Sequence, residues 1–271
     1  MATVELVVTD LDGTLWDQPD VVHPETVAAL AELERRGYPL VVATGRRLRS
    51  TREPLAALGL APPSVLFNGA LVVDLASGER LHRHTFTPET AAAVLGAFMA
   101  SGLEPCVYVD HDEVDVFVGS SPATHPRHLR AFGRWVRTAH LDEVVVSKPV
   151  FAFAILGQQS DRVQAIAAGL DGVAQPHVTR DREYGGSGIT VVPPNLSKWM
   201  GVETLCARMG LDAGAVLAIG DGPNDVELLT RAAVAAVPTD GHPAARACAT
   251  HVIGRAADGG WAEILELLEA C

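Results

Sequence analysis

Two acidic residues, Asp10 and Asp12, follow directly after the first apolar run of the chain, Val4 to Val8. A short valine-rich run that ends in polar residues and glycine is typical of a buried parallel strand entering a loop. Two carboxylates at that edge, separated by one residue, favour the binding of a cation, and one of them can act as a nucleophile. This first loop is therefore a candidate for metal-assisted nucleophilic chemistry.

Further polar residues follow two later predicted strands. Thr44 comes after the predicted strand 38–43, and Asp221 and Asp225 come after the predicted strand 215–219. In an open α/β sheet, ligands bind outside the carboxyl ends of the strands, where the strand order reverses. If the first strand and the strand 215–219 are neighbours there, their acids and the threonine converge. Carboxylates packed so closely need a cation to offset their repulsion, and hard oxygen ligands suit Mg²⁺.

Strands and helices alternate in the first and last parts of the chain with the spacing of βαβ units, which predicts an α/β fold with a doubly wound, Rossmann-like parallel sheet. The first part contains predicted strands 4–8, 38–43 and 64–67, helices 24–36 and 49–58, and a hairpin at 72–73 and 80–86. The last part contains predicted helices 197–209, 226–232 and 260–269 and strands 215–219, 233–237 and 251–253. We expect residues 1–86 and 189–271 to form one core domain.

The middle of the chain, residues 87–188, has a different order of elements. Its predicted helices are 88–101, 122–137 and 160–170, and its predicted strands are 105–109, 113–118, 151–156, 172–179 and 188–192. This order predicts an antiparallel sheet covered by helices on one face, and hence an inserted α+β domain. On the predicted helix 122–137, four arginines share one face, where they form either a solvated surface or a docking surface for an anionic substrate: Arg127, Arg130, Arg134 and Arg137.

The composition excludes some classes of partner. A formal net charge of −12 and a pI near 5.2 argue against nucleic acid or an anionic membrane surface, because both require basic surfaces. They do not argue against a phosphorylated small molecule, since a metal ion can supply local positive charge. No apolar run approaches the length of a membrane span and no basic leader precedes one, so we expect a cytoplasmic protein.

The chain resembles a phosphatase of the haloacid dehalogenase (HAD) superfamily, specifically the Cof-type branch with a large α/β cap domain. Four motifs carry this resemblance in the order of the family: Asp10-Leu-Asp12-Gly-Thr14, Thr44-Gly-Arg46, Lys198, and Gly220-Asp221-Gly-Pro-Asn224-Asp225. The inserted domain falls between the second and third motifs, as it does in this branch. One departure is Trp199, which stands where the family usually has a glycine after the lysine.

The resemblance implies a role for each motif residue. Asp10 is implied to be the nucleophile that forms an aspartyl-phosphate. Asp12 is implied to protonate the leaving oxygen and then to accept a proton from the attacking water. Thr44 and Lys198 are implied to hold the oxygens of the transferring phosphoryl group.

The resemblance also implies ligand-binding residues. Mg²⁺ is implied to bind the Asp10 carboxylate, the Asp12 main-chain carbonyl and Asp221, while Asp225 holds a metal-bound water or supports the site from behind. The implied substrate-binding residues are Gly45, Arg46, Asn68 and Asn224. Two of these have alternatives: Arg46 either reaches the phosphate or lies on the surface, and Asn68 either touches the substrate or makes a turn.

Within the superfamily, the acid at position 12 favours hydrolysis of a phosphate ester over dehalogenation, because a departing halide needs no proton. We therefore expect a Mg²⁺-dependent phosphatase that acts on a small phosphorylated metabolite, such as a sugar phosphate, as a monomer or homodimer. One alternative is a phosphotransferase or phosphomutase, in which Asp10 passes its phosphate to a second substrate. Another is a binding module that has lost activity, which the intact Asp10 and Asp12 disfavour.

Overall fold

The computed structural model describes residues 3–18, 21–181 and 184–270. The chain divides into two compact units, which are described separately below. The first unit is formed by residues 1–83 and 197–271, and the second by residues 84–196.

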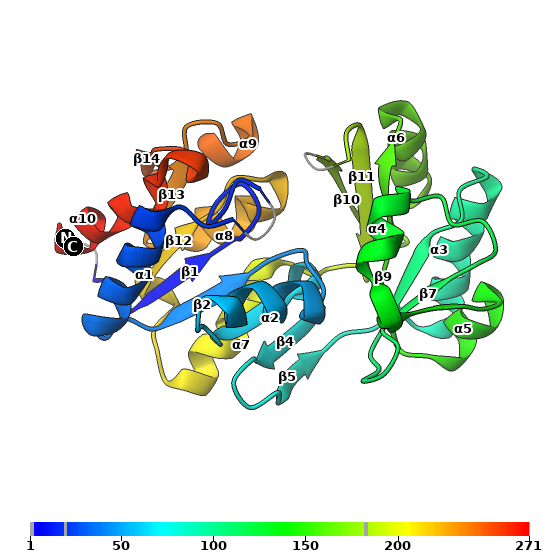
Figure 1. Cartoon of the computed structure of the whole chain (residues 1–271), viewed down its shortest axis with the longest axis horizontal. Coiled ribbons are helices and arrows are strands. Elements are labelled where there is room, and N and C mark those ends of the chain that lie inside the picture. The colour runs from blue at the N-terminus through cyan, green and yellow to red at the C-terminus, as the bar shows by residue number, and fades with distance from the viewer. Residues whose placement is uncertain (1–2, 19–20, 182–183, 271) are drawn as a thin grey trace. The chain divides into compact units, whose positions relative to one another are not determined.

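An eight-stranded sheet forms the centre of the first unit. Its strands are β1 (Leu6–Thr9), β2 (Leu40–Ala43), β3 (Pro63–Leu66), β4 (Leu71–Asp74), β5 (Arg80–Arg83), β12 (Val216–Ile219), β13 (Val234–Pro238) and β14 (His251–Ile253). Their order is β14-β13-β12-β1-β2-β3-β4-β5 (Figure 1). Neighbours from β14 to β3 are parallel, and β4 and β5 add antiparallel strands at one edge. The predicted doubly wound α/β core is confirmed.

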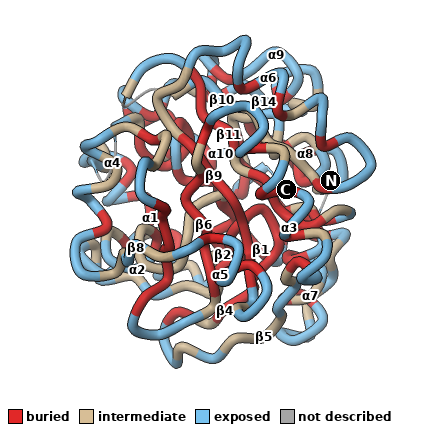
Figure 2. Tube along the Cα trace, turned by 90° about the vertical axis from the view of Figure 1, so that its right-hand side faces the viewer, coloured by how far each residue is buried: buried red, intermediate tan, exposed pale blue. Residues whose placement is uncertain are grey.

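The strand β1 lies between β2 and β12, and its register decides where the loops leave the sheet. Thr9, the last residue of β1, lies opposite Val42 of β2 and Ile219 of β12. Because all three strands are parallel, their carboxyl ends meet at one edge. The residues of β1 are all buried, as expected for a strand covered on both faces (Figure 2).

Helices and short 3₁₀ turns cover this sheet. The helices are α1 (Pro24–Arg35), α2 (Leu48–Ala57), α7 (Lys198–Met209), α8 (Val226–Arg231), α9 (Pro243–Arg246) and α10 (Ile264–Glu269). The 3₁₀ turns are η1 (Phe67–Gly69), η3 (Ala213–Ala215), η4 (Pro223–Asp225), η5 (Ala256–Asp258) and η6 (Gly260–Glu263). One face of the sheet packs on α7 and α8, where Val8, Val41 and Val65 form a buried cluster with Trp199 and Leu228. This cluster holds α7 against the strands that carry the first two motifs.

The start of α7 is fixed by its capping residue. The Ser197 hydroxyl oxygen accepts a hydrogen bond from the Met200 backbone N–H at 3.3 Å, which satisfies one of the unpaired donors of the first turn. The helix ends at Gly210, whose φ of 71° is readily adopted only by glycine. Lys198 is thereby placed at the first position of a helix with well-defined ends.

The second unit contains a six-stranded sheet in the order β10-β11-β9-β6-β7-β8. Its strands are β6 (Cys106–Val109), β7 (Val116–Val118), β8 (Val136–Thr138), β9 (Val150–Gln158), β10 (Gln175–Arg180) and β11 (Ser187–Val192). Its helices are α3 (Pro88–Ala100), α4 (Pro126–Ala131), α5 (Leu141–Ser147) and α6 (Ser160–Gly169), with a 3₁₀ turn η2 (Gly133–Trp135). All strand pairs are antiparallel except β7 with β8. Phe98 of α3, Val144 of α5 and Ile166 of α6 share one core with Phe153 of β9.

The second unit differs from the sequence-based expectation in three places. The predicted helix 122–137 is wrong in its second half, because α4 ends at Ala131 and the chain turns through Gly133, with a φ of 54°, into η2 and β8. The arginines at 127 and 130 therefore lie on α4, that at 134 in η2 and that at 137 in β8, so the four do not share a helix face. The helix α5 had no sequence prediction. The return to the first unit lies between residues 196 and 197 and not at 188/189, because β11 pairs with β9 and β10.

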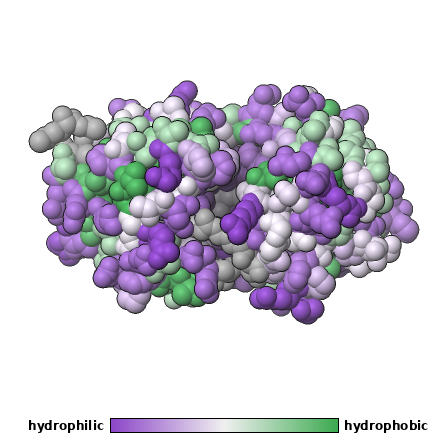
Figure 3. Space-filling view, turned by 90° about the horizontal axis from the view of Figure 1, so that it is seen from above, coloured by the Kyte–Doolittle hydropathy of each residue, from purple (hydrophilic) through white to green (hydrophobic). Residues whose placement is uncertain are grey.

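The surfaces of the two units seen in Figure 3 are mostly hydrophilic, with apolar residues scattered among polar ones. Among the described residues, no helix has both the length and the apolar character needed to cross a membrane.

Candidate active site

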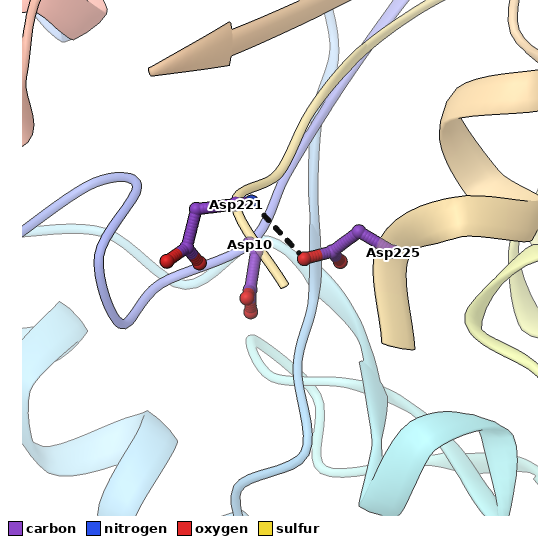
Figure 4. Close-up of side chains that lie close together, drawn as sticks. All are labelled: Asp10, Asp221 and Asp225. Carbon is purple, nitrogen blue, oxygen red and sulfur yellow. Dashed lines mark hydrogen bonds between the residues drawn. The ribbon is translucent and has the colours of Figure 1, made fainter. Parts of the chain in front are cut away.

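Three carboxylates meet at the carboxyl edge of the first unit's sheet. Asp10 follows β1 directly, Asp221 follows β12 by two residues, and Asp225 ends η4. One carboxylate oxygen from each lies within 4.8 Å of the others (Figure 4). The convergence that the sequence predicted follows from the parallel pairing of β1 with β12, which releases both loops on the same side.

A lysine on α7 completes this cluster. The Lys198 ammonium nitrogen lies 3.0 Å from Asp10 Oδ1 and 2.6 Å from Asp225 Oδ1, and its side chain is fully buried. Burial alone would lower the pKa of Lys198, but the charges of Asp10 and Asp225 outweigh it and raise the pKa above its usual value. Lys198 therefore remains a cation next to the predicted nucleophile.

Asp225 ties this lysine to the loop after β12. Its Oδ1 accepts the hydrogen bond from Lys198, and its Oδ2 accepts hydrogen bonds from the backbone N–H groups of Asp221 at 3.1 Å and Gly222 at 2.9 Å. Both oxygens of Asp225 are thus engaged with donors of the protein. The Asp225 side chain thereby fixes the backbone of the loop that carries Asp221, and Figure 4 shows the hydrogen bond from the Asp221 N–H to Asp225.

Asp10 is almost completely buried, with 6% of its surface exposed. Burial raises its pKa, the Lys198 charge opposes this, and the negative charges of Asp225, Asp221 and Asp12 raise the pKa further. The net direction is well above the usual value for an aspartate. An ionised, nucleophilic Asp10 therefore requires more positive charge than Lys198 alone provides, and a divalent cation shared with Asp221 would supply it.

The loop after β1 approaches the Asp221 carboxylate very closely at Gly13. This residue has a φ of 79°, and a Cβ atom built on it would collide with the Asp221 carboxylate, so only glycine fits. The neighbouring Thr14 hydroxyl donates a long hydrogen bond to Asp221 Oδ1 at 3.4 Å. The Gly-Thr pair of the first motif thus brings the first and last loops together.

Asp12 has a different environment from the other acids. Its side chain is 50% exposed, and its carboxylate accepts hydrogen bonds from Arg46 and from the indole of Trp16. Partial burial raises the pKa of Asp12, but the charge and hydrogen bonds of Arg46, with the Trp16 hydrogen bond, lower it overall. Arg46, predicted to bind substrate, contacts the predicted acid/base in this structure, and its role toward the substrate stays a prediction. The contact of Trp16 with Asp12 was not predicted from the sequence. The one indication in the sequence is that a tryptophan, whose indole N–H can donate a hydrogen bond, lies four residues after Asp12.

The remaining predicted residues link the loops after β2, β3 and β12. Thr44 is buried and its hydroxyl oxygen accepts a hydrogen bond from the Arg46 backbone N–H at 3.2 Å. Asn68 has φ 54° and ψ 30°, a left-handed conformation that asparagine adopts more readily than most residues, and its Oδ1 accepts a hydrogen bond from Asn224 Nδ2 at 2.9 Å. A Cβ atom on Gly45 would lie 3.2 Å from that same oxygen. These contacts connect the loops that follow β2, β3 and β12.

Comparison with known proteins places this geometry in a family context. A family model described as haloacid dehalogenase-like hydrolase matches residues 7–265. The chain is 24% identical over 270 residues to a pyridoxal phosphate phosphatase of Escherichia coli, covering 93% of this chain and 94% of that protein. It is 27% identical over 235 residues to a phosphoglycolate phosphatase of Methanopyrus kandleri, covering 87% of this chain and 84% of that protein.

Solved structures share the fold over nearly the whole chain. A haloacid dehalogenase-like hydrolase from Bacillus subtilis superimposes with a TM-score of 0.81 at 17% identity, covering 98% of this chain and 100% of that one. A sugar phosphatase of HAD subclass IIB superimposes with a TM-score of 0.78 at 17% identity, covering 99% of this chain and 100% of that one. At these identities the likeness is one of fold.

Proposed function

Because the chain belongs to the haloacid dehalogenase-like hydrolases and is a phosphatase of the Cof-type branch, we propose that it hydrolyses a small phosphorylated metabolite through an aspartyl-phosphate on Asp10, with Mg²⁺ as cofactor. The observation that carries this proposal is the buried cluster in which Lys198 contacts Asp10 and Asp225, with Asp221 within reach of both acids. A buried carboxylate beside a fixed cation and further oxygen ligands is suited to attack on phosphorus.

The donor set fits a divalent magnesium ion. Asp10 and Asp221 present carboxylate oxygens within 4.8 Å of each other, and the pKa of Asp10 is raised by its burial and by the negative charges of Asp225, Asp221 and Asp12. We assign the ion to these two carboxylates and to the Asp12 main-chain carbonyl, with Asp225 supporting Asp221 through the loop backbone. When bound, Mg²⁺ supplies charge compensation for the phosphoryl oxygens and keeps Asp10 ionised.

The protein residues divide the reaction into two steps. In the first, an Asp10 carboxylate oxygen forms a bond to phosphorus while the bond to the leaving oxygen breaks, and that oxygen takes its electron pair and a proton from Asp12. In the second, Asp12 removes a proton from a water molecule as the water oxygen attacks phosphorus, and the Asp10–phosphorus bond breaks to restore the carboxylate. Lys198 and the Thr44 hydroxyl hold the phosphoryl oxygens throughout.

For the substrate, we propose a sugar phosphate. The proteins of similar sequence and fold include phosphatases named for phosphoglycolate, pyridoxal phosphate and a sugar phosphate, all of which are small phosphate esters. The net charge of −12 would repel an anionic phosphate. Lys198, Arg46 and the metal ion supply positive charge near the phosphate and offset this repulsion. Cytoplasmic location and a monomeric or homodimeric state stay predictions.

Release of inorganic phosphate tests the reaction class. With Mg²⁺, we expect steady release of phosphate from members of a sugar-phosphate panel and from p-nitrophenyl phosphate. A phosphomutase would interconvert sugar-phosphate isomers with little phosphate release. A binding module would bind panel members without turnover, and either result would contradict the proposal.

The metal site can be tested without measuring activity. We expect saturating Mg²⁺ to raise the melting temperature of the wild-type protein by roughly 5 °C, because binding at about 100 times the Kd stabilises a fold by about 2.7 kcal/mol. Asp221→Asn should abolish this shift, whereas the charge-matched change Asp171→Asn, at an exposed position in the second unit, should leave it intact. An equal Mg²⁺ shift in Asp221→Asn would exclude Asp221 as a ligand.

A further inference from the structure

The Asp12 carboxylate is held on both of its oxygens by two side chains. Arg46 donates from Nε to Oδ2 at 2.7 Å and from Nη2 to Oδ1 at 2.6 Å, the parallel geometry that suits a guanidinium and a carboxylate. Trp16 donates from Nε1 to Oδ1 at 2.9 Å. A carboxylate fixed by three hydrogen bonds cannot rotate freely, although half of its side chain is exposed.

Trp16 is itself rigidly placed relative to Asp12. The Gly13 backbone N–H donates to the Trp16 carbonyl at 2.7 Å, and the Trp16 backbone N–H donates to the Leu11 carbonyl at 3.1 Å, so the loop closes on itself. The Trp16 side chain is fully buried, and a buried indole N–H needs a hydrogen-bond acceptor. Asp12 Oδ1 is that acceptor, which couples the packing of the ring to the position of the carboxylate.

Arg46 is anchored partly by the same ring. Its guanidinium carbon lies 4.9 Å from the centre of the Trp16 ring, and its Nη1 donates to the Ser50 carbonyl at 2.9 Å. Trp16 therefore contacts Asp12 directly through its N–H and indirectly through the arginine stacked on its face. The two donors differ in one respect: Arg46 is charged and favours an ionised partner, whereas an indole N–H bonds to a carboxyl oxygen whether or not the group carries a proton.

We propose that Trp16 is a positioning residue for proton transfer, whose indole N–H fixes the Asp12 carboxyl group in the orientation from which it protonates the leaving oxygen. This inference rests on the proposed function, because it takes Asp12 as the acid/base. Trp16 does not touch the reacting atoms in this account. It acts by holding the Asp12 carboxyl group through the hydrogen bond from its indole N–H to Oδ1.

Trp16→Phe tests this by removing the N–H while keeping an aromatic ring. The matched control is Trp199→Phe, because the Trp199 indole is also buried but its nitrogen has no hydrogen-bond partner among the described residues. Each protein is assayed with two substrates, in a single turnover for the rate of leaving-group release and in the steady state for KM. One is the best sugar phosphate of the panel, whose leaving oxygen needs a proton, and the other is 2,4-dinitrophenyl phosphate, whose leaving group departs as a stable anion.

For Trp16→Phe, we expect leaving-group release from the sugar phosphate to slow by about tenfold, a fraction of the total effect of an acid catalyst. Release of dinitrophenolate and the KM for both substrates should stay within about twofold of wild type, and Trp199→Phe should match wild type throughout. The rates on the two substrates are compared as a ratio within one preparation. A partial loss of folded protein lowers both rates equally and therefore does not change this ratio.

Two outcomes would overturn the inference: an equal loss on both substrates, which indicates a purely structural role, or no loss on either. Failure of the proposed function gives a different result, since the wild-type protein would then release neither dinitrophenolate nor phosphate.

Discussion

Replacing Asp10 by asparagine is expected to lower kcat by at least about 10⁴-fold, because the change removes the proposed nucleophile. Asparagine has nearly the same shape, so Lys198 keeps its contact with Asp225 and the fold should survive. Phosphate release and thermal unfolding, measured on the same preparation, separate loss of chemistry from loss of structure.

A covalent intermediate gives this prediction a second readout. Rapid acid quenching of the wild-type enzyme with a ³²P-labelled substrate should trap label on the protein, and the bond should be cleaved by hydroxylamine, as expected for an acyl phosphate. The Asp10→Asn protein should carry none. Turnover that persists in Asp10→Asn, or label that survives hydroxylamine, would show that another group forms the intermediate.

Replacing Lys198 by methionine is expected to damage both activity and stability. The side chain is fully buried between Asp10 and Asp225, so its removal leaves two buried carboxylates without their shared cation. Breaking such a pair from one side costs about 3–5 kcal/mol in the free energy of unfolding. Loss of a fixed positive charge beside the phosphoryl group should also lower kcat by about 10³-fold.

The stability deficit of Lys198→Met should depend on pH. Asp10 already has a raised pKa in the folded protein, and removing Lys198 takes away the charge that opposes this rise. Below its pKa in the unfolded chain, such a carboxyl group is protonated in both states and does not change the free energy of unfolding. As the pH rises from there through its higher pKa in the folded protein, the unfolded chain loses the proton more easily, and the fold becomes progressively less stable. The gap in stability between wild type and variant should therefore be small near pH 4 and grow toward pH 8.

The chain offers a matched control for this experiment in its other lysine. Lys148 lies at the end of α5 in the second unit, and Lys148→Met should change neither activity nor the pH profile of unfolding. Three of the four tryptophans, Trp16, Trp199 and Trp261, lie in the first unit, so tryptophan fluorescence reports mainly on that unit, with one contribution, from Trp135, in the second. A deficit for Lys198→Met that is constant from pH 4 to 8 would contradict the assignment of buried, uncompensated carboxylates.

Sequence patterns predicted the first unit more closely than the second, for physical reasons. Strands such as β1 and β12 are short apolar runs, as a parallel sheet covered on both faces requires, and the glycine and acidic residues that follow them mark where each strand ends. The segment 122–150 offers no comparable signal. Gly133 breaks the arginine-rich helix there, and α5 depends on packing Leu141 and Val144 into a core that is formed by distant residues.

In the candidate site, too, some features were predictable from the sequence and others were not. The acids and Lys198 were predictable because each occupies a motif position at the end of a strand or the start of a helix. The pairing of Asp12 with Arg46 joins residues 34 positions apart, and the role of Asp225 as a bridge between Lys198 and the backbone depends on loop geometry. Contacts of this kind are set by side-chain rotamers and not by periodicity, so a sequence pattern does not contain them.

The place of β1 in the sheet has a consequence for how the protein is made. Its partner β12 begins at Val216, after the whole second unit has been synthesised. At translation speeds of roughly 5–20 residues per second, β1 spends on the order of 10 s or more as an unpaired edge in the nascent chain. The second unit, being continuous in sequence, can fold during that interval. Asp10 and Asp221 can therefore come together only after the second unit has been synthesised.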